Sequence, residues 1–310
     1  MDRGIDASVE LSVELDRLGE SHPLALQAPR DRSLYKFLAM GMDHPQTETR
    51  ASYTALTETL IERLGIWWSP STYQRMPVLT PWCIRDRSAR YDQGPESWGA
   101  PRADGYLRDD NSIIKKLPLS VTVEAPEGHP YAGRRPWRGF TACHVWGTDV
   151  DGHPSGADPW LYSFVPNLVW LPTAIAPLSD RQGSRVQMML MQTALYLYAA
   201  APMRPLIEEY SKYAWSRLPA PLPEFGALRA DHLAQFTPDA AFYRRRIAYL
   251  DQFISGASSV LTTGQLTRKV ICTRYTTGFP ALDREHIAAF RSALSDYRDA
   301  LVGEPDPVPH

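Results

Sequence analysis

The feature that most constrains the fold is a group of short β-type segments in the middle of the chain. Between residues 111 and 172 the β-branched and aromatic content rises in four segments, "LSVTVEAP", "GFTACHVW", "LYSFV" and "NLVWLP". Each segment is bounded by proline, glycine or aspartate. Side chains of these types favour strands, and the bounding residues favour turns. The sequence therefore predicts a β-rich centre.

The segments on both sides of this centre have the periodicity of helices. Residues 33 to 65 place leucine and isoleucine side chains on one helix face before Gly65. Ser184 is a suitable N-cap for the apolar segment "RVQMMLMQTALYLYAAA", and Leu282 or Asp283 precedes a last amphipathic segment. We therefore expect an α+β fold with helical N- and C-terminal parts around the β-rich centre.

The same patterns predict four regions along the chain. Residues 1–105 form a helical and loop-rich N-terminal region, with mostly loop from Trp67 to Gly105 and one short strand near Met76 to Leu79. Residues 106–183 form the β-rich region, and residues 184–302 form a helical region that includes a strand at "RKVICTRY". Residues 303–310 form a disordered tail.

Composition restricts the cellular setting and the partners. The 310 residues are 44% hydrophobic, enough for a proper core, yet the longest apolar runs are too short and too polar to cross a bilayer. The acidic N-terminus lacks the apolar stretch of a secretion signal, so we expect a cytoplasmic protein without membrane contact. Its three cysteines show no CxxC spacing, which argues against structural zinc and disulfides. The net charge of -2 means that contact with nucleic acid requires local basic patches.

One histidine and one asparagine stand out in the β-rich region. The stretch "GFTACHVWGTDVDGHPSGADPWLYSFVPNLVWLP", residues 139–172, places His144 after one apolar run and Asn167 at the start of another, with a polar loop between them. This order resembles the HNH (ββα-metal) nucleases, and the segment also resembles bacterial restriction and phage-defence endonucleases. An ordinary strand, loop and strand is the structural alternative, with His144 a strand histidine and Asn167 a turn residue.

The resemblance implies a chemistry for this stretch. His144 would be the general base that takes a proton from water, and Asn167 would orient it. A divalent metal ion, Mg²⁺ or Mn²⁺, would stabilise charge on the phosphate of DNA. Cleavage of both strands of a duplex commonly needs two active sites, which favours a homodimer.

The stretch departs from the HNH pattern at two positions, and both concern the metal. Cys143 stands where an aspartate or histidine commonly precedes the general base, and Ala176 stands where a metal ligand usually lies. Carboxylates elsewhere are therefore the candidate ligands. Asp180 follows the second apolar run, Asp109 and Asp110 lie in "RDDN", and the loop after His144 offers further candidates at Asp149, Asp151 and Asp158. We expect the "RDDN" segment to pack beside the His144 strand and to contribute a carboxylate.

Basic clusters supply candidate contacts to DNA. Arg134, Arg135 and Arg138 in "GRRPWRGF" directly precede the His144 strand, and Lys115 and Lys116 follow "RDDN". Arginines next to aromatic residues can neutralise phosphates and stack on bases. Further clusters lie in "CIRDRSARY", with Arg85, Arg87 and Arg90, and in "YRRRIAY", with Arg244, Arg245 and Arg246.

The sequence leaves two rival functions open. One is a non-catalytic reader of nucleic acid or modified bases, with the Trp-rich segment from Trp67 to Trp98 as a stacking platform. The other is a small-molecule enzyme whose pocket is lined by Trp146, Trp160 and Trp170, with His144 acting on a metabolite. Both remain alternatives to a metal-dependent endonuclease at this level.

Overall fold

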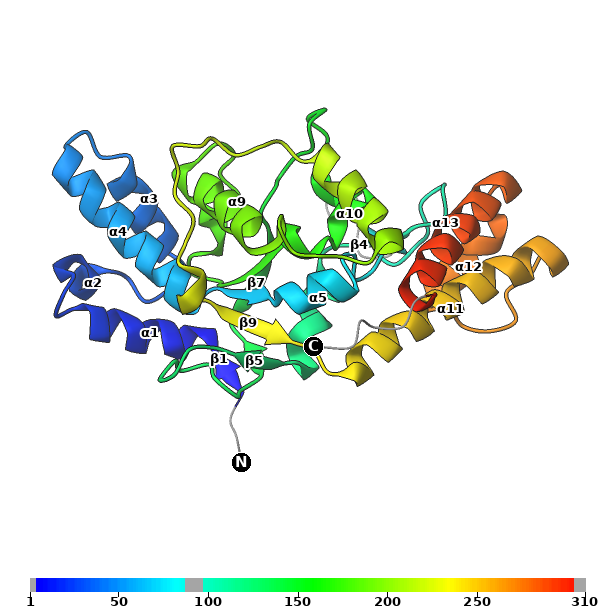
Figure 1. Ribbon diagram of the computed structural model, residues 1–310, viewed down its shortest axis with the longest axis horizontal. Coiled ribbons are helices and arrows are strands. Elements are labelled where there is room, and N and C mark those ends of the chain that lie inside the picture. The colour runs from blue at the N-terminus through cyan, green and yellow to red at the C-terminus, as the bar shows by residue number, and fades with distance from the viewer. Residues whose placement is uncertain (1–3, 87–96, 304–310) are drawn as a thin grey trace.

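A mixed five-stranded sheet lies at the centre of the protein, as the computed structural model in Figure 1 shows for residues 4–86 and 97–303. Its strands, in spatial order, are β5 (Thr122–Glu124), β9 (Ala234–Thr237), β2 (Ile66–Trp68), β8 (Leu168–Pro172) and β7 (Phe140–His144). Strands β9 and β2 are parallel, and the other neighbouring pairs are antiparallel. The α+β prediction is confirmed, with helices at both ends of the chain and the sheet between them.

The sheet takes strands from all three of the regions expected to be folded. Strand β2 comes from residues 1–105, strands β5, β7 and β8 from residues 106–183, and strand β9 from residues 184–302. Every residue of β8 is buried, and Trp170 on this strand packs edge-on against Trp68 and Phe236 at ring-centroid distances of 5.6 and 5.3 Å. One hydrophobic core therefore connects the three regions.

Helices from the two ends of the chain flank the sheet at opposite sides of the molecule (Figure 1). The N-terminal group consists of β1 (Ile5–Asp6), α1 (Ala7–Leu18), α2 (Pro23–Gln27), α3 (Leu34–Met42) and α4 (Thr47–Leu64). The C-terminal group consists of α11 (Ala240–Thr263), α12 (Thr273–Gly278), η7 (Phe279–Ala281) and α13 (Arg284–Val302), in which α11 packs against α13. Helices α9 (Arg185–Tyr198) and α10 (Pro205–Arg217) lie between the two groups in this view.

Short elements complete the connections around the sheet. They are α5 (Pro70–Arg75), β3 (Cys83–Arg85), β4 (Leu107–Asp109), α7 (Ser112–Lys116), η2 (Leu117–Ser120), β6 (Pro136–Arg138), η3 (Ser155–Ala157), α8 (Pro159–Tyr162), η4 (Val165–Asn167), η5 (Ala176–Leu178) and η6 (Ala230–His232). Strand β3 pairs with β4, and β1 pairs with β6, both in parallel. Of the helices that the structure describes, none has the length and apolar content needed to cross a membrane.

The local signals at helix starts agree with the structure. The Ser184 hydroxyl accepts a hydrogen bond from the Gln187 N–H at the start of α9, and the Asp283 carboxylate caps α13 in the same way. The predicted helix over residues 33–65 consists of two helices, α3 and α4. The break falls at Pro45, which has no N–H to donate and whose ring disfavours helical backbone at the residue before it.

Two strand predictions were wrong. The segment "RKVICTRY" forms no strand, because Ile271 has a left-handed φ of 55° and helix α12 begins at Thr273. Near Met76 to Leu79 there is a single bridge between Val78 and Phe164. The expected loop from Trp67 to Gly105 contains β2, α5 and β3 in its described part. Except for Gly303, the tail predicted to be disordered lies outside the described residues.

Candidate active site around His144

His144 is the last residue of β7 and pairs with Leu168 of β8, so the predicted strand, loop and strand form an antiparallel hairpin. The side chain is buried, with 7% of its surface exposed. Its Nε2 donates to the backbone carbonyl of Tyr162 at 2.9 Å, and its ring stacks on the Tyr162 ring at a centroid distance of 5.5 Å. Because a carbonyl can only accept, Nε2 carries a hydrogen, and Nδ1 is the ring nitrogen that bears the lone pair whenever the ring is neutral.

Asn167 fixes the backbone around His144. Its Oδ1 accepts from the Trp146 N–H at 2.7 Å, and its Nδ2 donates to the Leu161 carbonyl at 3.0 Å. The Asn167 carbonyl also accepts from the Val145 N–H at 3.0 Å. The fully buried side chain therefore ties the two ends of the loop from Val145 to Pro166 together. It supports the position of His144 through the backbone of the residues that follow it.

The "RDDN" segment lies next to His144, with Tyr162 as the connection. The Tyr162 hydroxyl donates to Asp109 Oδ2 at 2.8 Å, while the Tyr162 ring and carbonyl both contact His144. Asp109 is buried and also accepts from the Ser112 hydroxyl at 2.6 Å and from the Ile113 N–H at 2.9 Å. Its carboxylate is thus fully used in holding α7 and Tyr162, which makes it a poor metal ligand.

A pocket of about 500 Å³ opens beside His144. Its charged and titratable lining residues are Arg85, Asp86, Arg102, His144 and Asp180. The lining comes from the ends of β3 and β7, from η3 and from the segment between η5 and α9. Close packing of η3 depends on Gly156, since a Cβ there would lie 3.0 Å from the Cβ of Arg85. Segments far apart in the sequence therefore meet at one site.

Most charges in this pocket are held by described neighbours. Asp86 accepts from Arg108 Nε at 2.6 Å. Arg102 forms a fork with Asp104, with Nη2 at 2.5 Å from Oδ2, and donates through Nη1 to the Ala157 carbonyl at 3.0 Å. Burial by itself would lower the pKa of Arg102, but the Asp104 carboxylate outweighs it and raises the pKa. Arg102 therefore stays charged at the wall of the pocket.

Asp180 is the carboxylate best placed beside His144. It lies four residues after Ala176, lines the pocket and is exposed. Cys143 directly precedes His144, and burial raises the pKa of its thiol to about 12. The charge of Asp180 adds to this rise, and that of Arg85 opposes it. Asp110 does not line the pocket. Of the three predicted metal ligands Asp109, Asp110 and Asp180, only Asp180 faces this site.

The donor set fits Mg²⁺ or Mn²⁺ bound mainly through substrate. Mg²⁺ is commonly held by one or two carboxylates together with phosphate oxygens and water. Asp180 supplies one carboxylate, and His144 lines the same pocket. Asp180 is the residue of this chain that would hold the ion.

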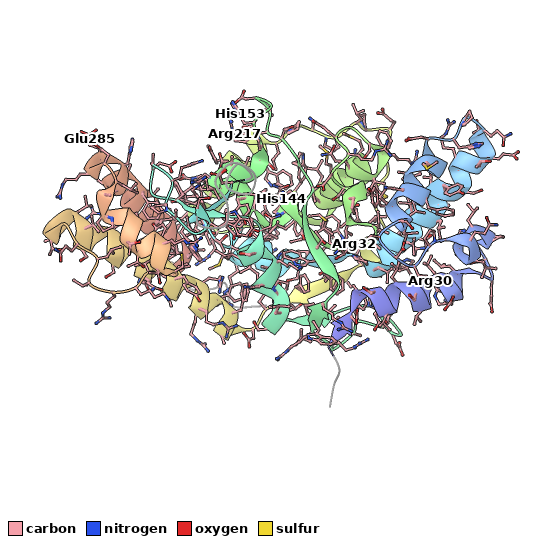
Figure 2. All side chains as sticks on the ribbon, turned by 180° about the vertical axis from the view of Figure 1, so that it is seen from behind. Arg30, Arg32, His144, His153, Arg217 and Glu285 are labelled. Carbon is pink, nitrogen blue, oxygen red and sulfur yellow. The ribbon has the colours of Figure 1, made fainter. Side chains whose placement is uncertain are left out.

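The carboxylates of the loop after His144 have structural partners. Asp149 accepts from the His153 N–H at 2.8 Å and from Arg217 Nη2 at 2.5 Å, and Arg217 Nη1 also contacts Asp151 at 2.7 Å. Figure 2 shows His153 and Arg217 together at one edge of the molecule, away from His144 in its interior.

Asp149, Asp151 and His153 are the one group of three candidate metal ligands found in the described part of the chain. Arg217 binds both carboxylates and offsets part of their charge. Asp158 caps α8 through the N–H groups of Trp160 and Leu161. These loop carboxylates are therefore not turned toward the His144 pocket.

The "GRRPWRGF" arginines lie at the other end of β7. Arg134 is paired with Glu10 at 2.7 Å, and Arg138 is paired with Asp6 at 2.6 Å and covers the Trp137 ring. Arg135 is exposed. From Phe140 to His144 the strand extends over about 13 Å, and these arginines all precede Phe140. Adjacency in the sequence does not bring them to His144.

Other basic residues have different positions. Lys115 and Lys116 are exposed on α7, and Lys116 lines a second pocket that is described below. Arg87 and Arg90 lie outside the described residues. Among the described residues, the cations at the His144 pocket are Arg85 and Arg102. Arg85 belongs to the basic cluster "CIRDRSARY", which is its only sequence signal. Arg102 has no such signal, because it lies outside the basic clusters in a segment predicted to be loop.

Most of the tryptophans named in the two rival functions are core residues, whereas Trp98 at the end of the Trp-rich segment is partly exposed. Trp67, Trp68 and Trp82 have at most 1% of their surface exposed, so they offer no face for stacking bases. Trp146 and Trp170 are equally buried, and Trp160 is packed against the core. The aromatic-lined pocket expected around Trp146, Trp160 and Trp170 is therefore filled by the protein itself. Comparison with protein-family models, curated proteins and solved structures finds no match to this chain.

Proposed function

We propose that this protein is a metal-dependent endonuclease that hydrolyses phosphodiester bonds of DNA, with the pocket around His144 as its active site. The observation that carries the proposal is the place of His144 in the wall of a charged pocket. The Tyr162 carbonyl holds Nε2–H, so Nδ1 is the ring nitrogen that would act as the base, and the described lining of the pocket adds two arginines, Arg85 and Arg102, and the carboxylates of Asp86 and Asp180.

Each of these pocket residues has a separate role in the proposed hydrolysis. His144 Nδ1 accepts a proton from the attacking water, which makes the water oxygen nucleophilic toward phosphorus. Arg85 and Arg102 lie where they can hold the phosphate oxygens, and guanidinium groups suit this contact because they donate in pairs. A divalent ion on Asp180 would stabilise the charge that builds up on the phosphate and the leaving oxygen.

The buried residues beside the pocket keep the base in position. Tyr162 stacks on the imidazole and is itself anchored by Asp109, and Asn167 fixes the loop that starts after His144. This preorganisation matters because a general base must stay within hydrogen-bond reach of the proton that it removes. From the resemblance of the His144 to Asn167 stretch to restriction and phage-defence nucleases, we infer that the enzyme would act on foreign DNA.

The direct test is a plasmid cleavage assay with His144→Ala, because the proposal predicts a loss of activity without loss of fold. Unmodified and methylated plasmids are incubated with Mg²⁺, Mn²⁺ or a chelator. A general base contributes about 10²- to 10⁴-fold to the rate, so we expect His144→Ala to lose at least 100-fold. His153→Ala is the matched control, since His153 is exposed and lies outside the pocket.

The assay has clear adverse outcomes. Metal-dependent cutting that survives His144→Ala would remove His144 from the mechanism. Absence of cutting by the wild type on every plasmid with either metal would contradict the endonuclease proposal itself. Circular dichroism and thermal unfolding of each variant exclude misfolding as the cause of a loss.

The arginines offer a second test, which separates the pocket from the remote cluster. Arg85→Ala should reduce cleavage at least tenfold, because it removes a charged contact to phosphate worth about 1.5–3 kcal/mol. Arg134→Ala should change cleavage much less at equal stability, since Arg134 is paired with Glu10 at the far end of β7. The reverse order of effects would move the phosphate site to the "GRRPWRGF" segment.

A further inference from the structure

A second pocket, of about 330 Å³, lies between the α7–η2 segment and the first half of α11. None of its described lining residues belongs to the His144 pocket. Aromatic side chains on its wall come from Trp82, Phe242 and Tyr249, and cationic ones from Lys116, Arg245 and Arg246. Its size is at the lower end of the range of about 300–1,000 Å³ that is usual for small-molecule sites.

The charge of this pocket is one-sided. Three cationic side chains line it, and its described lining includes no aspartate or glutamate. Arg245 Nη2 donates to the Ser120 hydroxyl at 3.2 Å, which keeps its guanidinium at the rim. Such a surface attracts an anion and repels cations.

Arg246 is the most informative residue of the pocket. Its guanidinium lies 4.9 Å from the centroid of the Tyr249 ring and 5.5 Å from that of Phe242, and no carboxylate among the described residues forms an ion pair with it. Burial, together with the charge of Arg245, lowers the pKa of Arg246 to about 10. A largely buried cation without a counter-ion is unfavourable, so an anion that enters the pocket gains from pairing with it.

Two buried donors in the lining lack an acceptor. The Trp82 Nε1–H and the Arg246 Nε–H are both buried, and neither has a hydrogen-bond partner in the described part of the chain. Both groups can donate and cannot accept. A ligand rich in acceptor oxygens would supply the partner that both donors lack.

The backbone conformation of the pocket wall also supports a ligand site. Ile271 lines the pocket with a φ of 55°, a conformation that is rare for a β-branched residue. Backbone held in such regions tends to cluster at ligand sites. The strained residue, the unpaired donors and the unbalanced charge all occur at the same pocket.

We propose that this pocket binds a nucleotide. The phosphate pairs with Arg246, Arg245 and Lys116, and the base lies against the partly exposed Tyr249 ring, because aromatic rings and arginine planes are the usual stacking surfaces for bases. The nucleotide is either free in solution or part of a nucleic-acid strand, and the chemistry of recognition is the same in both cases. The site does not depend on the endonuclease proposal, because its residues are separate from those of the His144 pocket.

The test is calorimetric titration with ligands that carry one or both halves of a nucleotide. The probes are adenosine 5′-monophosphate, adenosine, glucose 6-phosphate, inorganic phosphate and a short 5′-phosphorylated single-stranded DNA. The DNA arm uses His144→Ala, so that cleavage cannot interfere. We expect adenosine 5′-monophosphate or the DNA to bind at least tenfold more tightly than adenosine, glucose 6-phosphate or phosphate.

Variants assign the binding to the pocket. Arg246→Gln and Lys116→Gln should each weaken binding at least tenfold, since each removes a charge-assisted contact to phosphate. Lys116 is exposed, so its variant folds even if Arg246→Gln does not. Arg244→Gln is the matched control, because Arg244 is exposed on the same helix and does not line the pocket.

Each outcome decides for or against the proposal. Binding of the mononucleotide supports a free nucleotide, and binding of the DNA alone supports a strand. Equal affinity for glucose 6-phosphate and adenosine 5′-monophosphate would overturn the assignment of a base. Binding that is unchanged in Lys116→Gln and Arg246→Gln, or no binding of any probe at millimolar concentration, would overturn the site.

Discussion

Replacement of Asn167 by alanine tests how the loop after His144 is held. The substitution removes the acceptor of the Trp146 N–H and the donor to the Leu161 carbonyl, at 2.7 and 3.0 Å, in a side chain with 0% exposure. The Trp146 N–H is left without its acceptor, whereas the Leu161 carbonyl still accepts from the Phe164 N–H at 3.3 Å. One unpaired group in the interior costs about 1–3 kcal/mol, so we expect the free energy of unfolding to fall by about 1–3 kcal/mol, a substantial part of the roughly 5–15 kcal/mol that is typical of a folded protein.

Urea denaturation at pH 7 measures this loss. The midpoint should fall while the slope of the unfolding free energy with urea stays the same, because the variant exposes the same surface on unfolding. Gln192→Ala is the control. Its Nε2 donates to the Leu222 carbonyl at 3.0 Å in an exposed contact, so its loss should cost less than about 1 kcal/mol.

The experiment also separates two roles for Asn167. If the asparagine holds the backbone, stability and DNA cleavage decline together, because the ends of the loop separate around His144. An Asn167→Ala variant with wild-type stability would refute the argument, since the Trp146 N–H would then have found another acceptor at no cost. A loss of cleavage in such a stable variant would assign Asn167 a direct part in catalysis.

Three further predictions concern the surroundings of the site and the core. Tyr162→Phe keeps the ring that stacks on His144 but removes the donor to Asp109, so we expect a loss of about 1–2 kcal/mol in urea denaturation and a shift of the pH profile of cleavage. Burial and the charge of Arg63 lower the pKa of His129 in the folded protein. As the pH falls, the unfolded chain takes up a proton on this histidine at a higher pH than the folded protein does. The free energy of unfolding should therefore decrease as the pH falls below about 6.5. His129→Gln should flatten this pH dependence of the unfolding free energy between about pH 5 and 7.5. The same pH dependence in the variant and the wild type would contradict the assignment to His129. Burial raises the pKa of the Cys83 and Cys143 thiols, so a disulfide reagent at pH 8 should react quickly with Cys272 alone in native protein and with all three cysteines in denaturant.

Much of the local structure follows from the sequence, because its causes act over a few residues. The capping side chains of Ser184 and Asp283 mark helix starts by accepting backbone N–H groups within the first turn. The strands that carry His144 and Leu168 follow from β-branched and aromatic residues between turn formers. The strand prediction at "RKVICTRY" was wrong because composition favours a strand there, whereas the tertiary structure holds Ile271 in left-handed backbone.

The composition of the site could be predicted only in part. The position of His144 at the end of a strand and the presence of Asp180 nearby agree with the sequence, whereas Asp109 turns out to hold Tyr162 and α7. A carboxylate in the sequence does not reveal how many hydrogen bonds it already accepts. That number depends on which hydroxyls and N–H groups the fold brings to it.

The sequence by itself determined the strand that ends at His144, the loop that Asn167 closes and the helices at both ends of the chain, since these depend on neighbours along the backbone. Only the tertiary structure decided which charges share a pocket. A strand extends by about 3.3 Å per residue, so the arginines before Phe140 are carried away from His144, while Arg85 and Arg102 arrive there from other elements. The candidate active site therefore exists only because the fold brings residues from distant segments to the strand that carries His144.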